Sequence, residues 1–268
     1  MSEVLSEACG LRFGYQEDEL ILDRVDFEVR RGDVRIISGE SGKGKSTILR
    51  LLTGLERPLP DELLGSVTGQ VFLFGEDIWD IPRTRLQDLR KRTGFVFQNN
   101  ALLSNMTVED NIAVPLRYHT NLPESEISRK VRRWIDLLLL SGHEDKRPAH
   151  LSLGMQKRAA VARAMAMEPE ILFLDEPTAG LDAKNTDIML SLIGNLRALS
   201  NVAIVMITHD LNSAKSLGGR IALLVDGHLR RARTMEELLL SPDLQERELV
   251  RENDDKGTRF DEESSFPA

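Results

Sequence analysis

The sequence of 268 residues predicts an α/β fold with a mainly parallel core sheet and an inserted helical region. Short apolar segments of strand length alternate with helical patterns in residues 20–54 and again in residues 171–225. This alternation is typical of a parallel sheet covered by helices. Between these two parts, residues 98–168 show helical periodicity. A glycine-rich turn also stands between a predicted strand and a predicted helix, near residue 40.

The strands are predicted from short apolar segments that contain β-branched and aromatic residues. In chain order they lie at residues 20–29, 34–37, 69–74, 94–97, 171–174, 202–208 and 220–225. A turn at residues 31–33 separates the first two strands, so we expect a hairpin that feeds a buried strand.

The helices are predicted from apolar residues at helical spacing and from residues that start or stop a helix. The first predicted helix begins after the glycine-rich turn and ends at Gly54. The others lie at residues 123–142, 152–167, 187–199 and 211–217. The second helix is expected to place five apolar residues on one face: Ile127, Val131, Ile135, Leu138 and Leu139. Pro169 stops the third helix.

The composition argues against several classes of function. The net charge of −8 does not favour broad electrostatic contact with nucleic acid, so we expect no nucleic-acid partner. The single cysteine, Cys9, cannot form an intrachain disulfide, which fits a reducing compartment. No segment reaches the roughly 18 consecutive apolar residues of a membrane span. Residues 1–10 lack the features of an export signal. We therefore expect a cytoplasmic protein that attaches to a membrane only through a protein partner.

Residues 39–46 match the spacing of a P-loop, the glycine-rich loop that binds phosphate. Glycines let successive backbone N–H groups turn inward, and the N-terminus of the following helix adds partial positive charge. We expect Lys45 to bridge the β- and γ-phosphates of a nucleotide and the Ser46 hydroxyl to ligate Mg²⁺. The residues predicted to bind nucleotide here are Gly39, Glu40, Ser41, Gly42, Lys43, Gly44, Lys45, Ser46 and Thr47. The alternatives are a structural turn for the loop and simple solvation for Lys43, which occupies a free position of the motif.

Two acidic residues, Asp175 and Glu176, directly follow the predicted strand at residues 171–174. Open α/β sheets bind their ligands at the carboxyl ends of the strands. We expect Asp175 to hold Mg²⁺ and Glu176 to act as general base on the attacking water. Such a pair alone is more simply a solvated turn or a helix cap. Its position after a P-loop in the same chain favours nucleotide hydrolysis.

With these two motifs in place, the sequence resembles the ATP-binding cassette (ABC) family from about residue 9 to residue 240. The resemblance implies a P-loop NTPase cassette with a mainly parallel core sheet, an antiparallel β edge and an inserted α-helical subdomain. It also implies ATP and Mg²⁺ as cofactors and ATP hydrolysis coupled to transport. The expected parts are a RecA-like core in two segments (1–98 and 169–241), the helical subdomain (99–168) and an acidic C-terminal tail (242–268).

Four further residues match single positions of the family's motifs. Tyr15 lies where family members place an aromatic ring on adenine, and Gln98 matches the Q-loop glutamine, a metal ligand and a hinge toward the permease. Asp182 matches the D-loop, which couples the two sites of a dimer, and His209 matches the switch histidine at the γ-phosphate. Outside this family context Tyr15 would be a core aromatic, Gln98 a surface amide and His209 an ordinary surface or core histidine. The resemblance thus implies Lys45, Glu176 and His209 as catalytic residues and Ser46, Gln98 and Asp175 as metal ligands.

Residues 151–158 resemble the LSGGQ signature of the family, with Ser152 and Gly154 retained at a helix N-terminus. Leu153 and Met155 replace the usual Gly and Gln. In the family this site binds the γ-phosphate of ATP held by the second subunit, so the resemblance implies a homodimer. Ser152 as a plain N-cap is the alternative, and the two roles are compatible because a capped helix end binds anions.

A narrower resemblance to the ATPases of Mla- and Mce-type lipid transport systems lies in residues 97–103 and 111–120. Relatives in those systems often carry the Gly-Met pair seen at Gly154 and Met155. The resemblance implies an integral permease dimer, an MCE-domain lipid-binding protein and a small cytoplasmic regulatory subunit as partners, at the inner face of the inner membrane. Two alternatives remain open: the ATPase of a lipoprotein-releasing or cell-division type ABC system, and a weakly active regulatory cassette.

Overall fold

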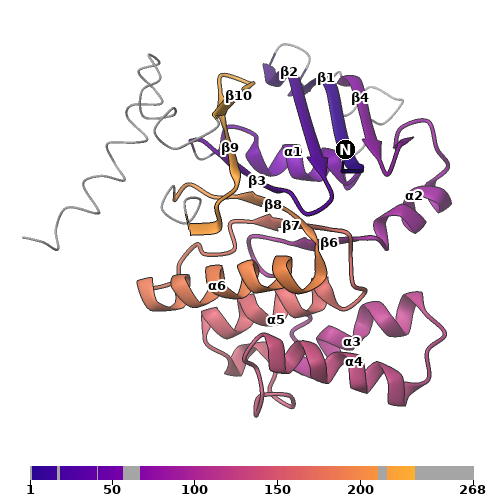
Figure 1. The fold of residues 1–268 in the computed structure, drawn as a ribbon, viewed down its shortest axis with the longest axis vertical. Coiled ribbons are helices and arrows are strands. Elements are labelled where there is room, and N and C mark those ends of the chain that lie inside the picture. The colour runs from indigo at the N-terminus through magenta and orange to yellow at the C-terminus, as the bar shows by residue number, and fades with distance from the viewer. Residues whose placement is uncertain (1, 17–18, 41, 57–66, 211–215, 233–268) are drawn as a thin grey trace, which may run out of the picture.

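The larger of two β-sheets has six strands in the order β10-β9-β3-β8-β7-β6. The computed structural model describes residues 2–16, 19–40, 42–56, 67–210 and 216–232 (Figure 1). Among the described strands of this sheet only β10 is antiparallel to its neighbour. The strands are β3 (Val34–Ser38), β6 (Thr93–Val96), β7 (Ile171–Asp175), β8 (Ala203–Ile207), β9 (Arg220–Val225) and β10 (His228–Ala232). Because the others are parallel, their carboxyl ends meet at one edge of the sheet.

The smaller sheet has four antiparallel strands in the order β2-β1-β4-β5. They are β1 (Val4–Gln16), β2 (Glu19–Arg30), β4 (Val67–Leu73) and β5 (Glu76–Asp77). The predicted hairpin of residues 20–29 with 34–37 is therefore wrong, because β2 pairs with β1 while β3 lies between β8 and β9 in the larger sheet. Burial explains the difference. Described residues of β2 alternate between buried and more exposed positions, as in a sheet with one covered face, whereas β3 is buried almost throughout.

The helices occupy both sides of the larger sheet. α1 follows β3 and lies between the two sheets, while α5 and α6 run along the opposite face and α3 and α4 lie beyond α5 (Figure 1). None of the described helices is both long and apolar enough to cross a bilayer. The helices are α1 (Lys45–Leu52), α2 (Arg83–Arg90), α3 (Val108–His119), α4 (Glu124–Leu137), α5 (Leu153–Met165) and α6 (Ala183–Ser200), with a 3-10 turn at Pro148–His150.

Alternate side chains of the larger sheet point into two separate apolar cores. Ile36 and Leu172 pack with α3, α4, α5 and α6 on one face. Ile37 and Phe173 pack on the other face with α1 and the smaller sheet. All four side chains are fully buried. The sheet is thus fixed from both sides, and so is the edge where its parallel strands end.

Two helices differ from their predicted extents. α4 ends at Leu137, and Leu139 adopts a φ of 54° and is 56% exposed, so it does not belong to the predicted apolar face. α6 begins at Ala183 rather than at residue 187, because the Asp182 side chain caps it by accepting a hydrogen bond from the Asn185 N–H. Most of the helix predicted at residues 211–217 lies outside the described residues. The predicted acidic tail at 242–268 lies wholly outside them.

Candidate functional site

The glycine-rich loop connects the end of β3 to the start of α1. Gly39, Gly42 and Gly44 have φ angles of 142°, 79° and 95°, a region that residues with a Cβ rarely adopt. A Cβ on Gly44 would lie 2.2 Å from a methyl carbon of Ile21 in β2. Gly44 is therefore required both by the turn and by the close approach of β2. Ser41, also predicted to bind nucleotide, lies outside the described residues.

The Lys45 side chain folds back over this loop. Its Nζ donates hydrogen bonds to the backbone oxygens of Gly39 at 2.8 Å and Glu40 at 2.6 Å. Burial lowers the pKa of Lys45, while Glu176, Asp175 and Glu40 act in the opposite direction. Lys43, by contrast, extends outward with a side chain that is 56% exposed and lies 3.9 Å from a Glu40 carboxylate oxygen. The ammonium of Lys45 and the N-terminus of α1 thus place positive charge together, which suits a phosphate group.

A hydroxyl and a carboxylate suited to a divalent cation lie next to the loop. Ser46 Oγ donates to Asp175 Oδ1 at 3.0 Å, although 129 residues separate them. Asp175 is 3% exposed at the end of β7, and its burial raises the pKa of the carboxyl group. Mg²⁺ prefers hard oxygen ligands and usually takes one or two from the protein and the rest from phosphate and water. The pair fits that ion, and no cluster of three or more His, Cys, Asp or Glu suited to a metal occurs among the described residues.

Gln98, the third predicted metal ligand, is exposed in the turn that follows β6. Strand register gives its position: Val96 of β6 pairs with Leu174 of β7, so Gln98 follows β6 at the edge where Glu176 follows β7. The structure thus places Gln98 at the same edge of the sheet as the acidic pair.

Glu176 is held by both its backbone and its side chain. Its N–H donates to the Ile207 carbonyl of β8 at 3.1 Å, and its Oε2 lies 2.9 Å from His209 Nδ1. Glu176 has a φ of 48°, unusual for a residue with a side chain, and such conformations concentrate at functional sites. The side chain of Glu176 is 11% exposed and that of His209 is 55% exposed. The structure therefore brings two of the three predicted catalytic residues, Glu176 and His209, into contact at this edge of the sheet.

Tyr15 stands beside α1 near the end of β1. Its hydroxyl donates to Glu56 Oε1 at 2.9 Å and lies 3.3 Å from Thr47 Oγ1, and its ring packs edge-on against Phe13. The residue is 40% exposed, and its partial burial raises the pKa of the phenol. The ring is thus held beside Thr47 in the first turn of α1 and is partly exposed to solvent. An exposed aromatic ring next to the phosphate loop suits stacking on a base.

The signature residues and Asp182 form a second group. Ser152 caps α5 by accepting from the Met155 N–H at 3.3 Å. Asp182 accepts from both the backbone and the side-chain amide of Asn185 at 2.8 Å, and a Cβ on Gly154 would lie 3.1 Å from Asn185 Oδ1. Asn185, to which the sequence assigns no role, therefore joins the N-termini of α5 and α6. Within the part of the chain that the structure describes, the side-chain hydrogen bonds of Ser152 and Asp182 stay within this group.

Leu153, the unusual residue of the signature, is 42% exposed. One of its methyl groups lies 3.1 Å from the position a Cβ would take on Gly180, in the loop before α6. This side chain therefore packs across the gap between the signature and the loop that carries Asp182.

A groove of about 790 Å³ is lined by residues of α2, β6, α3 and α5. Phe95, Phe97 and Leu103 give it an apolar lining, and Tyr118, 82% exposed, stands at it. Arg163 also lines the groove and donates to the carbonyls of Asn100 and Ala101. Gln98 directly follows Phe97, so this groove lies next to the edge of the sheet that carries the predicted nucleotide-binding residues.

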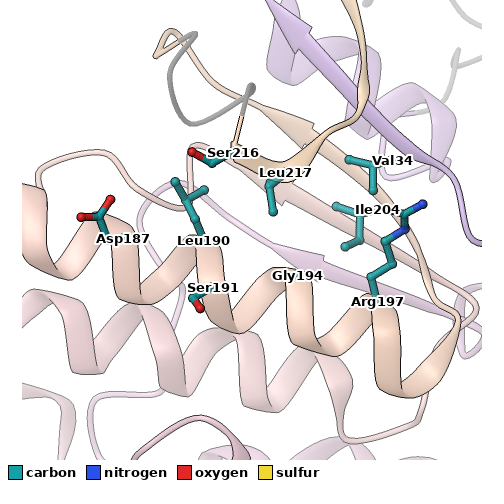
Figure 2. Close-up of a pocket in the computed structure, with 9 residues that line it drawn as sticks. All are labelled: Val34, Asp187, Leu190, Ser191, Gly194, Arg197, Ile204, Ser216 and Leu217. Carbon is teal, nitrogen blue, oxygen red and sulfur yellow. The ribbon is translucent and has the colours of Figure 1, made fainter. Parts of the chain in front are cut away.

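A smaller pocket of about 330 Å³ lies along α6 and contains none of the predicted site residues (Figure 2). Leu190 and Leu217 face each other across it, with Arg197 at one end (Figure 2). Arg197 donates to the carbonyl of Gly32. We assign no role to this pocket.

Comparison with known proteins decides the family. The sequence profile described as ABC transporter matches residues 22–179. The intermembrane phospholipid transport system ATP-binding protein MlaF of Haemophilus influenzae is 33% identical over 260 residues, which are 97% of this chain and 95% of that protein. The chain belongs to the ABC transporter family. The methionine import ATP-binding protein MetN of Clostridium acetobutylicum is 34% identical over 90% of this chain and 72% of that protein.

Solved structures agree with this family. The dimeric ATP-binding cassette MJ0796, bound to ADP and Pi, superposes with a TM-score of 0.75 at 28% identity, over 85% of this chain and 98% of that one. CbiO1 of Clostridium perfringens, part of the ABC transporter complex cbiONQ, superposes with a TM-score of 0.78 at 26% identity, over 93% of this chain and 94% of that one. The ABC cassette described here is therefore an ATP-binding, ATP-hydrolysing transporter subunit, and the predicted family, fold class and ATPase activity are confirmed.

Proposed function

We propose that this ABC cassette hydrolyses ATP as a homodimer and drives lipid transport, with phospholipid the first candidate, through a partner permease. The observation that carries the lipid assignment is the similarity to MlaF along 97% of this chain and 95% of that protein. The stretches at residues 97–103 and 111–120 and the Gly154-Met155 pair support the same assignment. We place the subunit in the cytoplasm, on the inner face of the membrane that holds the permease.

Methionine import is the second candidate, because the MetN protein of C. acetobutylicum is as similar in identity, 34% over 90% of this chain. Purification of the tagged chain from membranes distinguishes the two. Recovery of an MCE-domain protein, with or without a small cytoplasmic regulatory subunit, supports lipid transport. Recovery of a methionine-binding protein supports import, and recovery of a permease with a large extracytoplasmic domain supports a lipoprotein-releasing or cell-division type system.

The residues around the phosphate loop have distinct proposed roles. Lys45 releases its two loop carbonyls and binds the β- and γ-phosphates, while the loop N–H groups bind phosphate oxygens. Ser46, Asp175 and Gln98 would hold Mg²⁺, which neutralises phosphate charge when it is bound with ATP. Tyr15 would stack on the adenine ring through its exposed surface, and its contact with Thr47 holds it beside the start of α1.

Glu176 is proposed as the general base. A base must lie within hydrogen-bonding reach of the water it activates, and Glu176 extends from the strand edge on which Asp175 lies. His209 holds the carboxylate through Nδ1 and leaves its other ring nitrogen for the γ-phosphate. The ring is 55% exposed, which leaves it accessible to a ligand that enters from solvent.

The second half of each ATP site is proposed to come from another copy of the chain. Ser152 and Asp182 contact their own group through Met155 and Asn185, and the serine lies at a helix N-terminus that can bind an anion. The dimeric MJ0796 cassette with ADP and Pi supports such an arrangement. A site that spans two copies makes hydrolysis depend on dimerisation.

A complementation experiment tests this proposal. Lys45→Ala removes the phosphate-binding lysine and Gly154→Asp puts a negative side chain at the signature, so neither homodimer should hydrolyse ATP. In mixed dimers one site receives both defects and the other receives neither. Half of the randomly paired dimers are mixed, and each mixed dimer has one intact site. Co-expression should therefore restore up to about a quarter of the wild-type activity, and less if the intact site depends on ATP in its neighbour. Failure of the mixture to exceed either single variant would contradict a site shared between copies.

A further inference from the structure

The side chain of a buried lysine on α5 contacts the backbone of Glu176, the proposed general base. Lys157 is 2% exposed, and its Nζ donates to the carbonyl oxygen of Glu176 at 3.1 Å. Burial lowers the pKa of Lys157, and the carboxylates of Glu176 and Asp175 act in the opposite direction. The sequence assigns it no role, although it precedes the buried Val161 by one helical turn and so shares the buried face of α5.

Four hydrogen bonds surround Glu176. Its N–H donates to Ile207 of β8 and its carboxylate is bonded to His209. Its carbonyl oxygen accepts from the Ala179 N–H at 3.2 Å, within the turn after β7, and from Lys157 Nζ on α5. A residue with a side chain keeps a φ of 48° only when its surroundings hold it there. Among these contacts, only that of Lys157 comes from the helix that begins at the signature.

We propose that Lys157 is a positioning residue that makes the orientation of Glu176 depend on the position of the signature helix. This inference rests on the proposed role of Glu176 as general base. Lys157 lies five residues after the Ser152 cap, within the same rigid helix. The start of α5 is proposed to bind the nucleotide of the partner copy, and Lys157 holds the base in its own copy. Binding of ATP in one site would then improve the geometry of hydrolysis in the other.

Two consequences distinguish this role from a structural one. A lysine that only stabilises the fold affects the amount of folded protein, and it leaves the turnover of each folded molecule unchanged. A lysine that positions Glu176 affects kcat more than the KM for ATP, because it does not touch the nucleotide. It also affects the dependence of rate on ATP concentration, because it couples the two sites.

The test uses Lys157→Met, which keeps the apolar stem and removes the donor, and Lys157→Arg, which keeps a donor. Lys146→Met, at an exposed lysine in the loop before the 3-10 turn, is the matched control. For Lys157→Met we expect kcat to fall about tenfold or more, since a misplaced catalytic group can cost about 100-fold. KM should change less than about twofold, and the Hill coefficient for ATP should fall toward 1. Lys157→Arg should recover part of both kcat and cooperativity, and the control should match the wild type.

Wild-type kcat and Hill coefficient in folded Lys157→Met would overturn the proposal, and so would equal losses in Lys157→Met and Lys157→Arg. If Lys157→Met does not fold, Lys157→Leu, which also removes the donor and suits a buried position, replaces it under the same criteria. Glu176→Gln is measured in parallel. If Glu176→Gln keeps its turnover, the base assignment itself is wrong. If it loses turnover while Lys157→Met does not, only the coupling through Lys157 is wrong.

Discussion

The Nδ1 atom of His209 lies 2.9 Å from the Oε2 atom of Glu176, although 33 residues separate the two in the chain. Strand register explains the contact. Asp175, the last residue of β7, pairs with Ile207, the last residue of parallel β8. The residues that follow both strands therefore emerge side by side at one edge of the sheet. The phosphate loop follows β3, the other neighbour of β8, so it reaches the same edge.

Replacement of Glu176 by Gln should stop hydrolysis and leave ATP binding intact. The amide keeps the shape of the side chain but cannot accept a proton from water, and loss of a general base costs about 100- to 10,000-fold in rate. With ATP the variant should accumulate as a dimer that the wild type forms only transiently. Phosphate release and size-exclusion chromatography with and without ATP measure both effects. Unchanged turnover would remove Glu176 from the role of base.

Replacement of Lys45 by Ala should lower ATPase activity by about 100-fold or more, because one fixed charge at the transferring phosphate is lost. Lys43→Ala is the matched control, since that side chain is 56% exposed and contacts only Glu40 at 3.9 Å among its described ion pairs. The control should keep nearly full activity. Equal losses in the two variants would mean that general positive charge, and not the position of Lys45, matters.

The phosphate loop and the acidic pair could be predicted because each depends on a short local pattern. Gly44 and Lys45 belong to a glycine-rich pattern that predicts a turn followed by a helix, and Asp175 and Glu176 directly follow an apolar strand. The pairing of β2 with β1 could not be predicted in this way, because strand pairing depends on contacts distant in sequence and on which face of the strand is buried. The contacts made by Asn185 and Lys157 were missed for the same reason: a polar residue in a helix has no signature until the helix is packed.

Glycines of the phosphate loop should differ in their tolerance of Ala. Gly44→Ala meets both an unfavourable φ, which costs roughly 1–2 kcal/mol, and a clash with Ile21, which adds about 1–3 kcal/mol. Gly42→Ala meets only the unfavourable φ, since no atom lies within 4 Å of its added Cβ. Chemical denaturation should therefore show the larger loss of unfolding free energy for Gly44→Ala. The reverse order would contradict the packing of β2 against the loop.

Tyr118 should be required for transport but not for basal ATP hydrolysis. It is 82% exposed at the groove beside Gln98, where we expect the permease to dock. Exposed aromatic residues at interface centres often contribute 2 kcal/mol or more to binding, so Tyr118→Ala should weaken permease binding about 30-fold. Arg129→Ala, on the exposed side of α4, is the control. A pull-down with the permease measures binding, and ATPase assays of the isolated cassette measure basal hydrolysis. Normal permease binding by the variant would mean that the permease does not dock on this part of the groove.

Asp175→Asn should make the protein more stable at neutral pH while it abolishes hydrolysis. Burial raises the pKa of Asp175, so the folded state binds its proton more tightly than the unfolded state does. The wild type therefore loses stability as pH rises from the unfolded pKa through the raised folded pKa, and the loss persists above it. Asn cannot ionise and still accepts the hydrogen bond from Ser46. Thermal unfolding should show a higher Tm for the variant at pH 7. The difference should shrink as the pH falls through the raised folded pKa and reach its minimum near pH 4, the unfolded pKa of an aspartate being about 3.9. A lower Tm at pH 7 would mean that the ionised carboxylate stabilises the fold, through its contacts with Ser46 and Lys45, by more than its burial costs.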